Sequence, residues 1–181
     1  MSKIVIGIDP GSRFTGYGIV KMTGSDVAYI GSGCIKTGNG DLASKLKVIF
    51  DAISTLVEQY RPDCMAIEET FLSKNVQSTV KLSEARAAAA IVAGANHGLS
   101  VYEYTPMQIK QSVVGYGWAK KEQVQYMIKH ILHLSSNPQA DAADALACAL
   151  CHCFTSKVTQ TIGNGVATQG AVHGRYQRDK K

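Results

Sequence analysis

The chain begins with short apolar segments separated by glycine-rich breaks. Lys3–Asp9 is rich in β-branched residues and is followed by Pro10, which is typical of a strand buried on both faces. Two further stretches of strand-forming residues follow, Phe14–Met22 and Val27–Lys36, with glycines in the breaks after each. Three successive strands of this kind predict an antiparallel meander.

After the meander, apolar residues recur at helical spacing. Leu42–Tyr60 has apolar positions three or four residues apart, with Asp41 as the expected N-cap and Pro62 beyond its end. The later predicted elements are the strand Cys64–Ile67, the helix Ser78–Asn96, the strand Ser100–Tyr104 and the helices Met107–Val114, Glu122–Leu134 and Ala140–Phe154. This order predicts an α/β fold: a mixed five-stranded sheet, three antiparallel strands and then parallel ones, flanked by helices.

Residues 1–154 contain all of these elements and are expected to form one domain. The chain has 181 residues, of which 45% are hydrophobic and 18% charged; this is enough for one core and too short for a two-domain enzyme. Residues 155–181 hold five of the 19 basic side chains and one of the 14 acidic ones, and we expect a flexible basic tail. Such a tail suits phosphate binding or simple solvation equally, so the net charge of +5 is weak evidence for nucleic acid.

Cysteine usage and hydropathy bear on the compartment. No apolar run is long enough for a membrane span or a signal-peptide core, so we expect no membrane association and a cytoplasmic location. The odd number of cysteines, five, argues against a secreted disulfide framework. The cluster Cys148–Cys153, with His130 and His133, could be taken for a metal site. Because one apolar helix carries the whole cluster, we expect reduced thiols that pack as small hydrophobic residues.

The alanine-rich segment Ser83–Ala95 has almost no polar face. A helix of this kind is either enclosed within the fold or covered by a partner. We expect a homodimer, because the commonest symmetric assembly buries one self-complementary patch.

Four carboxylates are placed where they can converge. Asp9 ends the first buried strand, and Glu68 occupies the equivalent end of the fourth. If these strands are parallel neighbours, the two carboxylates lie about 5 Å apart. Asp141 and Asp144 are three residues apart and share one face of a predicted helix. Packing that helix against the strand ends gathers all four acids in one pocket.

Four converging carboxylates repel one another, and neither Asp9 nor Asp141 has a lysine or arginine next to it in the sequence. Carboxylate oxygens are suitable ligands for Mg²⁺, with Mn²⁺ as a substitute. Two such ions roughly 4 Å apart can stabilise the attacking and leaving oxygens of a phosphodiester. The acids therefore predict metal-dependent hydrolysis of nucleic acid.

Each acid also has a simpler explanation when it is considered alone. Asp141 could cap its helix, Asp144 could face solvent, and Asp9 could begin a turn before Pro10. Glu69 is expected on the opposite side of its strand from Glu68, although the sequence leaves an exchange of their roles open.

Three stretches carry a specific resemblance. They are Gly7–Gly18 (GIDPGSRFTGYG), Ala66–Glu68 followed by Phe71–Asn75, and Asn137–Leu146 (NPQADAADAL). In order and spacing, from about Lys3 to Phe154, the chain resembles the RuvC family of Holliday-junction resolvases. The resemblance implies a ribonuclease-H-like fold and a homodimer that uses Mg²⁺ to nick two strands of like polarity symmetrically across a four-way DNA junction, in homologous recombination and DNA repair.

The same resemblance assigns roles to individual residues. It makes Asp9, Glu68, Asp141 and Asp144 the metal-binding catalytic acids. It also implies that Phe71 stacks on a base near the crossover, that Lys110 and Lys121 contact the region of the scissile phosphate, and that the branch-migration proteins RuvA and RuvB are partners.

These DNA contacts have alternatives. Phe71 could be a core aromatic, and Lys110, Lys120, Lys121 and Lys129 could form a solvated helix face. Lys120 stands next to Lys121, so the sequence leaves open which of the two contacts phosphate.

Three other functions share parts of this pattern. An actin-like or sugar-kinase-like ATPase also has an apolar strand followed by Asp and Gly, but it needs two such domains and a second phosphate loop. A module that binds junctions without cutting them and a nuclease that acts on RNA both remain open from the sequence.

Overall fold

The computed structural model describes residues 2–10, 14–69 and 78–163, and side chains at 86–156 within the last range. The strands are β1 (Ser2–Asp9), β2 (Phe14–Thr23), β3 (Asp26–Lys36), β4 (Cys64–Glu68) and β5 (Ser100–Tyr104). They form one sheet in the order β3-β2-β1-β4-β5. The pairs β1–β2 and β2–β3 are antiparallel, and β1–β4 and β4–β5 are parallel. This confirms the predicted mixed sheet.

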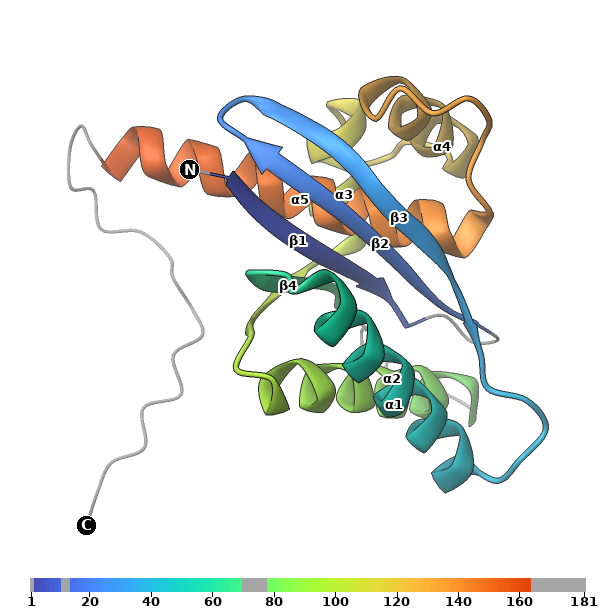
Figure 1. Cartoon of the computed structure of the whole chain (residues 1–181). Coiled ribbons are helices and arrows are strands. Elements are labelled where there is room, and N and C mark those ends of the chain that lie inside the picture. Colours follow the sequence, from blue (N-terminus) through green and yellow to red (C-terminus); the bar gives the residue numbers. More distant parts are fainter. Residues whose placement is uncertain (1, 11–13, 70–77, 164–181) are drawn as a thin grey trace, which may run out of the picture.

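The helices are α1 (Leu42–Tyr60), α2 (Ser78–Asn96), α3 (Pro106–Val114), α4 (Lys121–Ile131) and α5 (Ala140–Gly163). Helices α1 and α2 cover one face of the sheet, and α5 crosses the other face with α3 and α4 beside it (Figure 1). Each layer has its own core. The first contains Ile6, Ile49 and Met65, and the second contains Val5, Leu146 and Leu150.

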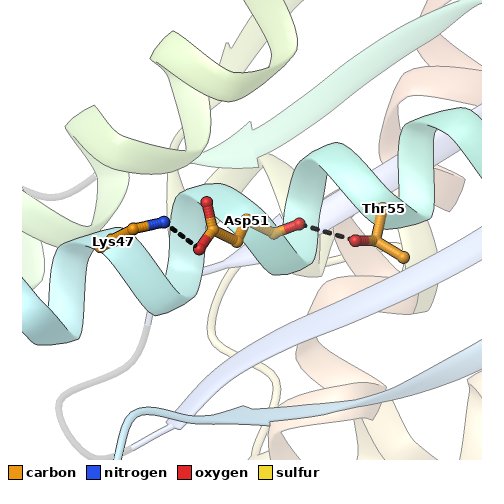
Figure 2. Close-up of polar contacts among 3 residues, drawn as sticks. All are labelled: Lys47, Asp51 and Thr55. Carbon is orange, nitrogen blue, oxygen red and sulfur yellow. Dashed lines mark hydrogen bonds and ion pairs between the residues drawn. The ribbon is translucent and has the colours of Figure 1, made fainter.

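Helix α1 begins and ends as its sequence predicts. The Asp41 side chain accepts a hydrogen bond of 2.8 Å from the Ser44 backbone N–H, and Arg61 ends the helix in the left-handed region, with a φ of 47°. On the helix surface, Lys47 pairs with Asp51 at 2.6 Å, and the Thr55 hydroxyl donates to the Asp51 carbonyl at 2.9 Å (Figure 2). These polar contacts lie on the exposed side of α1, and apolar side chains such as Ile49 and Ile53 pack in the core beneath it.

Two helix ends differ from the predictions. Helix α4 ends at Ile131 rather than Leu134, and His133 adopts a φ of 51°. Helix α5 continues past Phe154 to Gly163, so residues 155–163 are helical rather than part of an irregular tail. The sequence predicts an end at Phe154 because the apolar periodicity is lost there. That loss does not end a helix by itself, and the sequence has no glycine or proline between Phe154 and Gly163. Residues 164–181 lie outside the described residues, and the flexible tail stays a prediction.

The cysteines pack as the sequence predicts. Cys64, Cys148, Cys151 and Cys153 are buried, and none of the five cysteines, all of which lie in the described residues, is in a disulfide. Across residues 2–10, 14–69 and 78–163, no helix is long and apolar enough to cross a membrane.

Helix α2 is not enclosed within the fold. It buries one side, including Ala90 and Ala93, against the sheet, while Val92 is 57% exposed. A groove between α1 and α2 is lined by Leu46, Lys47, Phe50, Asp51, Ala88, Ala89 and Val92. The outer side of this layer is therefore the part that a partner could cover.

Candidate active site

The first two acids lie side by side at the carboxyl end of the sheet. Strands β1 and β4 are parallel, and their last registered pair is Ile8 with Ile67. Asp9 and Glu68 occupy the next position on each strand, and both are half-buried. The prediction that the first and fourth strands are parallel neighbours, with Asp9 and Glu68 at adjacent ends, is confirmed.

Three glycines allow helix α5 to lie directly on β1 and β2. A Cβ on Gly16 would overlap the carbonyl group of Asp141, and one on Gly18 would lie 2.7 Å from the backbone nitrogen of Leu146. A Cβ on Gly7 would likewise overlap the backbone of α5, 2.7 Å from the Ala149 nitrogen. Since contacts below 3.0 Å do not occur at real Cβ atoms, no other residue fits at these positions without movement of the helix.

This close packing brings Asp141 and Asp144 to the strand ends. Asp141 lies in the first turn of α5. The Ala143 N–H donates a hydrogen bond to the carbonyl of Gln139, which precedes Asp141 by two residues, so the helical hydrogen bonding already spans Asp141. Asp141 is therefore inside the helix rather than its N-cap, and its negative charge is favourable there. Asp144 follows nearly one turn later and lines a pocket with Glu68.

Electrostatic coupling shows how closely the four acids converge. Burial, together with the charges of Glu68, Asp144 and Asp141, raises the pKa of Asp9 to about 8, against a lowering by Lys121. Burial and Asp144 raise the pKa of Glu68 to about 7. The structure thus brings all four acids predicted from the sequence to the same end of the sheet, where the pKa values of Asp9 and Glu68 are raised to neutral or above.

Two lysines line the same pocket as the acids. Lys121 Nζ lies 2.6 Å from Asp144 Oδ2, which raises the pKa of Lys121. Lys110 and Lys121 line the pocket together with Glu68, Asp144 and the side chains of Pro106, Ile109, Val124 and Ala147. Lys120 is exposed, and its backbone N–H is capped by the Gln123 side chain at 2.8 Å. Of the two adjacent lysines, Lys121 is the one that faces the acids.

The donor chemistry of the pocket fits a hard divalent cation. All four anionic groups are carboxylates, and their mutual repulsion is what such an ion relieves. Among the described residues, however, no three His, Cys, Asp or Glu side chains already stand in a ligating arrangement. The four carboxylates therefore share one part of the molecule without forming a metal-ligand set as they stand.

Sequence reasoning missed Cys34. This residue pairs with Gly16, which pairs with Asp9, so the three form a row across β3, β2 and β1. Burial and the charge of Asp141 raise the pKa of its half-buried thiol. Strand register, which the sequence does not specify, is what brings this thiol next to the acids.

Two other predicted residues have different outcomes. Phe71 lies outside the described residues, so its role stays a prediction. Glu69 donates its backbone N–H to the Tyr104 carbonyl at 2.8 Å, while Glu68 lines the pocket and interacts with Asp9. The structure thus favours Glu68 over Glu69 as the member of the acid cluster.

A sheet of this order, with acids gathered at its carboxyl end by a crossing helix, defines the class of ribonuclease-H-like nucleases. The family model "Crossover junction endodeoxyribonuclease RuvC" matches residues 5–152. The chain belongs to the RuvC family and is a nuclease of that metal-dependent family.

Relatives cover nearly the whole chain. The crossover junction endodeoxyribonuclease RuvC of Cronobacter sakazakii is 55% identical over 154 residues, which cover 85% of this chain and 88% of that protein. The corresponding protein of Edwardsiella ictaluri is 52% identical over 162 residues, covering 90% of this chain and 93% of that protein.

Solved structures agree with this assignment. T. thermophilus RuvC in complex with a Holliday junction substrate has a TM-score of 0.80 at 32% identity and covers 86% of this chain and 96% of that one. A yeast mitochondrial Holliday junction resolvase has a TM-score of 0.67, covering 88% of this chain and 81% of that one. At 14% identity, the yeast protein shows the fold alone.

Proposed function

We propose that this protein resolves four-way DNA junctions by symmetric, Mg²⁺-dependent hydrolysis of phosphodiester bonds in homologous recombination and DNA repair. The observation that supports this most directly is the convergence of Asp9, Glu68, Asp141 and Asp144 in a chain of the RuvC family. Holliday-junction binding by the T. thermophilus relative supports the choice of substrate.

The four acids are the proposed metal ligands and catalytic acids. Bound Mg²⁺, expected as a pair and replaceable by Mn²⁺, supplies Lewis-acid stabilisation to the oxygens that attack and leave phosphorus. Asp9 and Glu68 release their protons when the cation binds, because positive charge lowers the pKa of both carboxyls. Asp144 would bind the cation through the carboxylate that pairs with Lys121.

Lys110 and Lys121 are the proposed contacts of the scissile phosphate. Their ammonium groups reach the same pocket as Glu68 and Asp144. A phosphate that enters this pocket meets the positive charge of these two lysines, which stabilises the negative charge that develops during hydrolysis. Phe71 is proposed to stack on a base near the crossover.

Symmetric cleavage requires two active sites, and we propose a homodimer. The exposed outer side of α1 and α2, with Val92 at its surface, is the face that supports this assembly. Light scattering that gave a monomer at micromolar concentration would contradict it.

RuvA and RuvB are the proposed protein partners, and the cytoplasm, where bacterial chromosomal DNA lies, is the proposed location. We also propose that residues 1–154 form the nuclease domain and residues 155–181 a basic appendage, although helix α5 crosses this boundary.

A gel assay on a mobile synthetic junction tests the function. Paired nicks of like polarity are expected with Mg²⁺ or Mn²⁺, and no products with chelator. Tight binding without metal-dependent products would instead indicate a binding module. More efficient competition by RNA than by junction DNA would indicate an RNA nuclease.

A further inference from the structure

Trp118 is the most exposed large apolar side chain among the described residues. It is 81% exposed, and it is the single tryptophan of the chain. Burial of an indole is strongly favourable, so a tryptophan left in water has a large apolar area available for a partner. The residue lies between α3 and α4, close to the pocket that holds the acids.

The backbone on either side of Trp118 is anchored. Gly115 ends α3 with a φ of 93° and donates its N–H to the Gln111 carbonyl at 2.9 Å. Gly117 packs so closely on Met107 that a side chain there would overlap it, and Ala119 is 1% exposed. Because its neighbours are held inward, the segment presents the Trp118 side chain outward.

The surroundings of Trp118 combine apolar and basic groups. Tyr116 is 43% exposed, and Met107, which contacts the Gly117 position, is 49% exposed. Lys120 and Lys121 follow after Ala119 in the chain. Aromatic platforms next to lysines are the surface that nucleic acids recognise, since the rings stack on bases and the ammonium groups bind phosphate.

Trp118 is close to the acid pocket along the chain, because Lys121 contacts an acid of that pocket. Lys121 Nζ contacts Asp144 Oδ2 at 2.6 Å, and the three residues from Trp118 to Lys121 span at most roughly 10 Å of backbone, so with the length of the lysine side chain added the Trp118 backbone lies within about 20 Å of the acid pocket. A DNA strand whose phosphate enters the pocket therefore has nucleotides a few positions away within reach of the indole.

We propose that Trp118, with Tyr116 beside it, is a DNA-contacting platform that packs against a nucleotide a few positions from the scissile phosphate. This inference rests on the proposed function. It adds a contact outside the acid pocket, from the segment between α3 and α4.

The single tryptophan makes a direct test possible. In Asp9→Asn protein with Mg²⁺, which is expected to bind without cutting, a synthetic four-way junction should quench Trp118 emission and protect it from acrylamide. Trp118→Ala should weaken junction binding about 10-fold, and Trp118→Phe should recover part of the loss. Because the side chain is exposed, the melting temperature should not change.

Tyr29→Ala is the matched control. Tyr29 is 40% exposed on β3 and pairs with Val20, near the hairpin turn and away from the end of β2 that pairs with Asp9. Its removal should leave junction affinity unchanged.

The outcomes separate the two proposals. If the junction binds and is cut but neither the emission nor the Trp118→Ala affinity changes, the platform is wrong and the function stands. An emission change that follows protein concentration without DNA would assign Trp118 to a protein interface and overturn the inference. If no variant binds or cuts junctions, the proposed function itself fails.

Discussion

Gly16 lies against the first turn of α5 so closely that the Asp141 carbonyl oxygen occupies the space of a Cβ. Gly16 is also the register partner of Asp9. One residue without a side chain therefore sets the spacing between an acid on a strand and an acid on a helix that lies more than 120 positions further along the chain.

Gly16→Ala tests this spacing. The new methyl group must displace the start of α5, which should lower the free energy of unfolding by about 1–3 kcal/mol. The rate of cleavage at saturating junction should fall at least about tenfold, because displacements near 1 Å disturb reacting geometry severely. Single-turnover cleavage and thermal melting measure the two effects.

Gly31→Ala provides the matched control. A Cβ at Gly31 would meet its nearest neighbour, the Tyr60 hydroxyl, at an ordinary 3.4 Å. Stability and cleavage should stay close to those of the original protein. Cleavage by Gly16→Ala at the original rate would show that α5 position does not control the site.

Asp9→Asn should abolish cleavage and preserve junction binding. The substitution removes a ligand charge but keeps the shape of the side chain and leaves Lys110 and Lys121 in place. Single-turnover assays and band-shift titrations on one junction distinguish the two effects. Cleavage near the original rate would count heavily against the role of the four acids.

The same substitution should stabilise the metal-free protein at neutral pH. An unfolded Asp loses its proton near pH 3.8, whereas the folded-state pKa of Asp9 is about 8. Between these values the folded protein holds a proton that the unfolded chain has lost, so stability falls as pH rises. Asn lacks this linkage, and its advantage should grow from about pH 4 to pH 8.

Melting in chelator measures this effect, and at pH 7.5 a rise of at least about 2–4 °C is expected, corresponding to 1 kcal/mol. Asp51→Asn is the control, because it removes an exposed carboxylate whose pair with Lys47 contributes little to stability. A pH-independent difference between Asp9→Asn and the original protein would contradict the linkage.

Lys121→Gln should separate catalysis from stability. The Lys121–Asp144 pair is half-exposed on the lysine side, so its loss should change the free energy of unfolding by less than about 1 kcal/mol. Cleavage should fall at least about tenfold, because the phosphate loses a positive contact. Lys21→Gln removes an exposed lysine of β2, in the part of the strand that pairs with Ile4 rather than with Asp9, and should leave cleavage intact. Equal rates for the two variants would remove Lys121 from the site.

His152 should make the protein sensitive to mild acid. Its Nδ1 lies 2.8 Å from the Tyr104 hydroxyl and its Nε2 lies 3.3 Å from Cys64 Sγ. Burial, with a smaller effect of Lys3, lowers its pKa to about 4 from 6.5. Since the unfolded chain takes up the proton first, stability should fall by roughly 2–4 kcal/mol as pH drops from 6.5 to 4.

Denaturant titrations of His152→Gln measure this contribution. Glutamine can still form hydrogen bonds but does not titrate in this range, so the variant should be less stable at pH 7 and less sensitive to acid. An acid dependence as steep as that of the original protein would assign the effect to other groups.

Most elements of the fold, and the four acids as candidate site residues, were predictable from local patterns along the chain. Apolar spacing, the Asp41 cap and the strand ends at Asp9 and Glu68 are local patterns, and local backbone physics was sufficient to predict them. Parallel pairing of β1 and β4 followed from the order of elements.

Tertiary structure alone decided which side chains meet. The extension of α5 to Gly163, the choice of Lys121 over Lys120, the approach of Cys34 to Asp9 and the exposure of Trp118 all depend on how distant segments pack and in which register. Packing distances of this kind are set by the whole core at once, because a shift of one residue or one methyl group moves every neighbour.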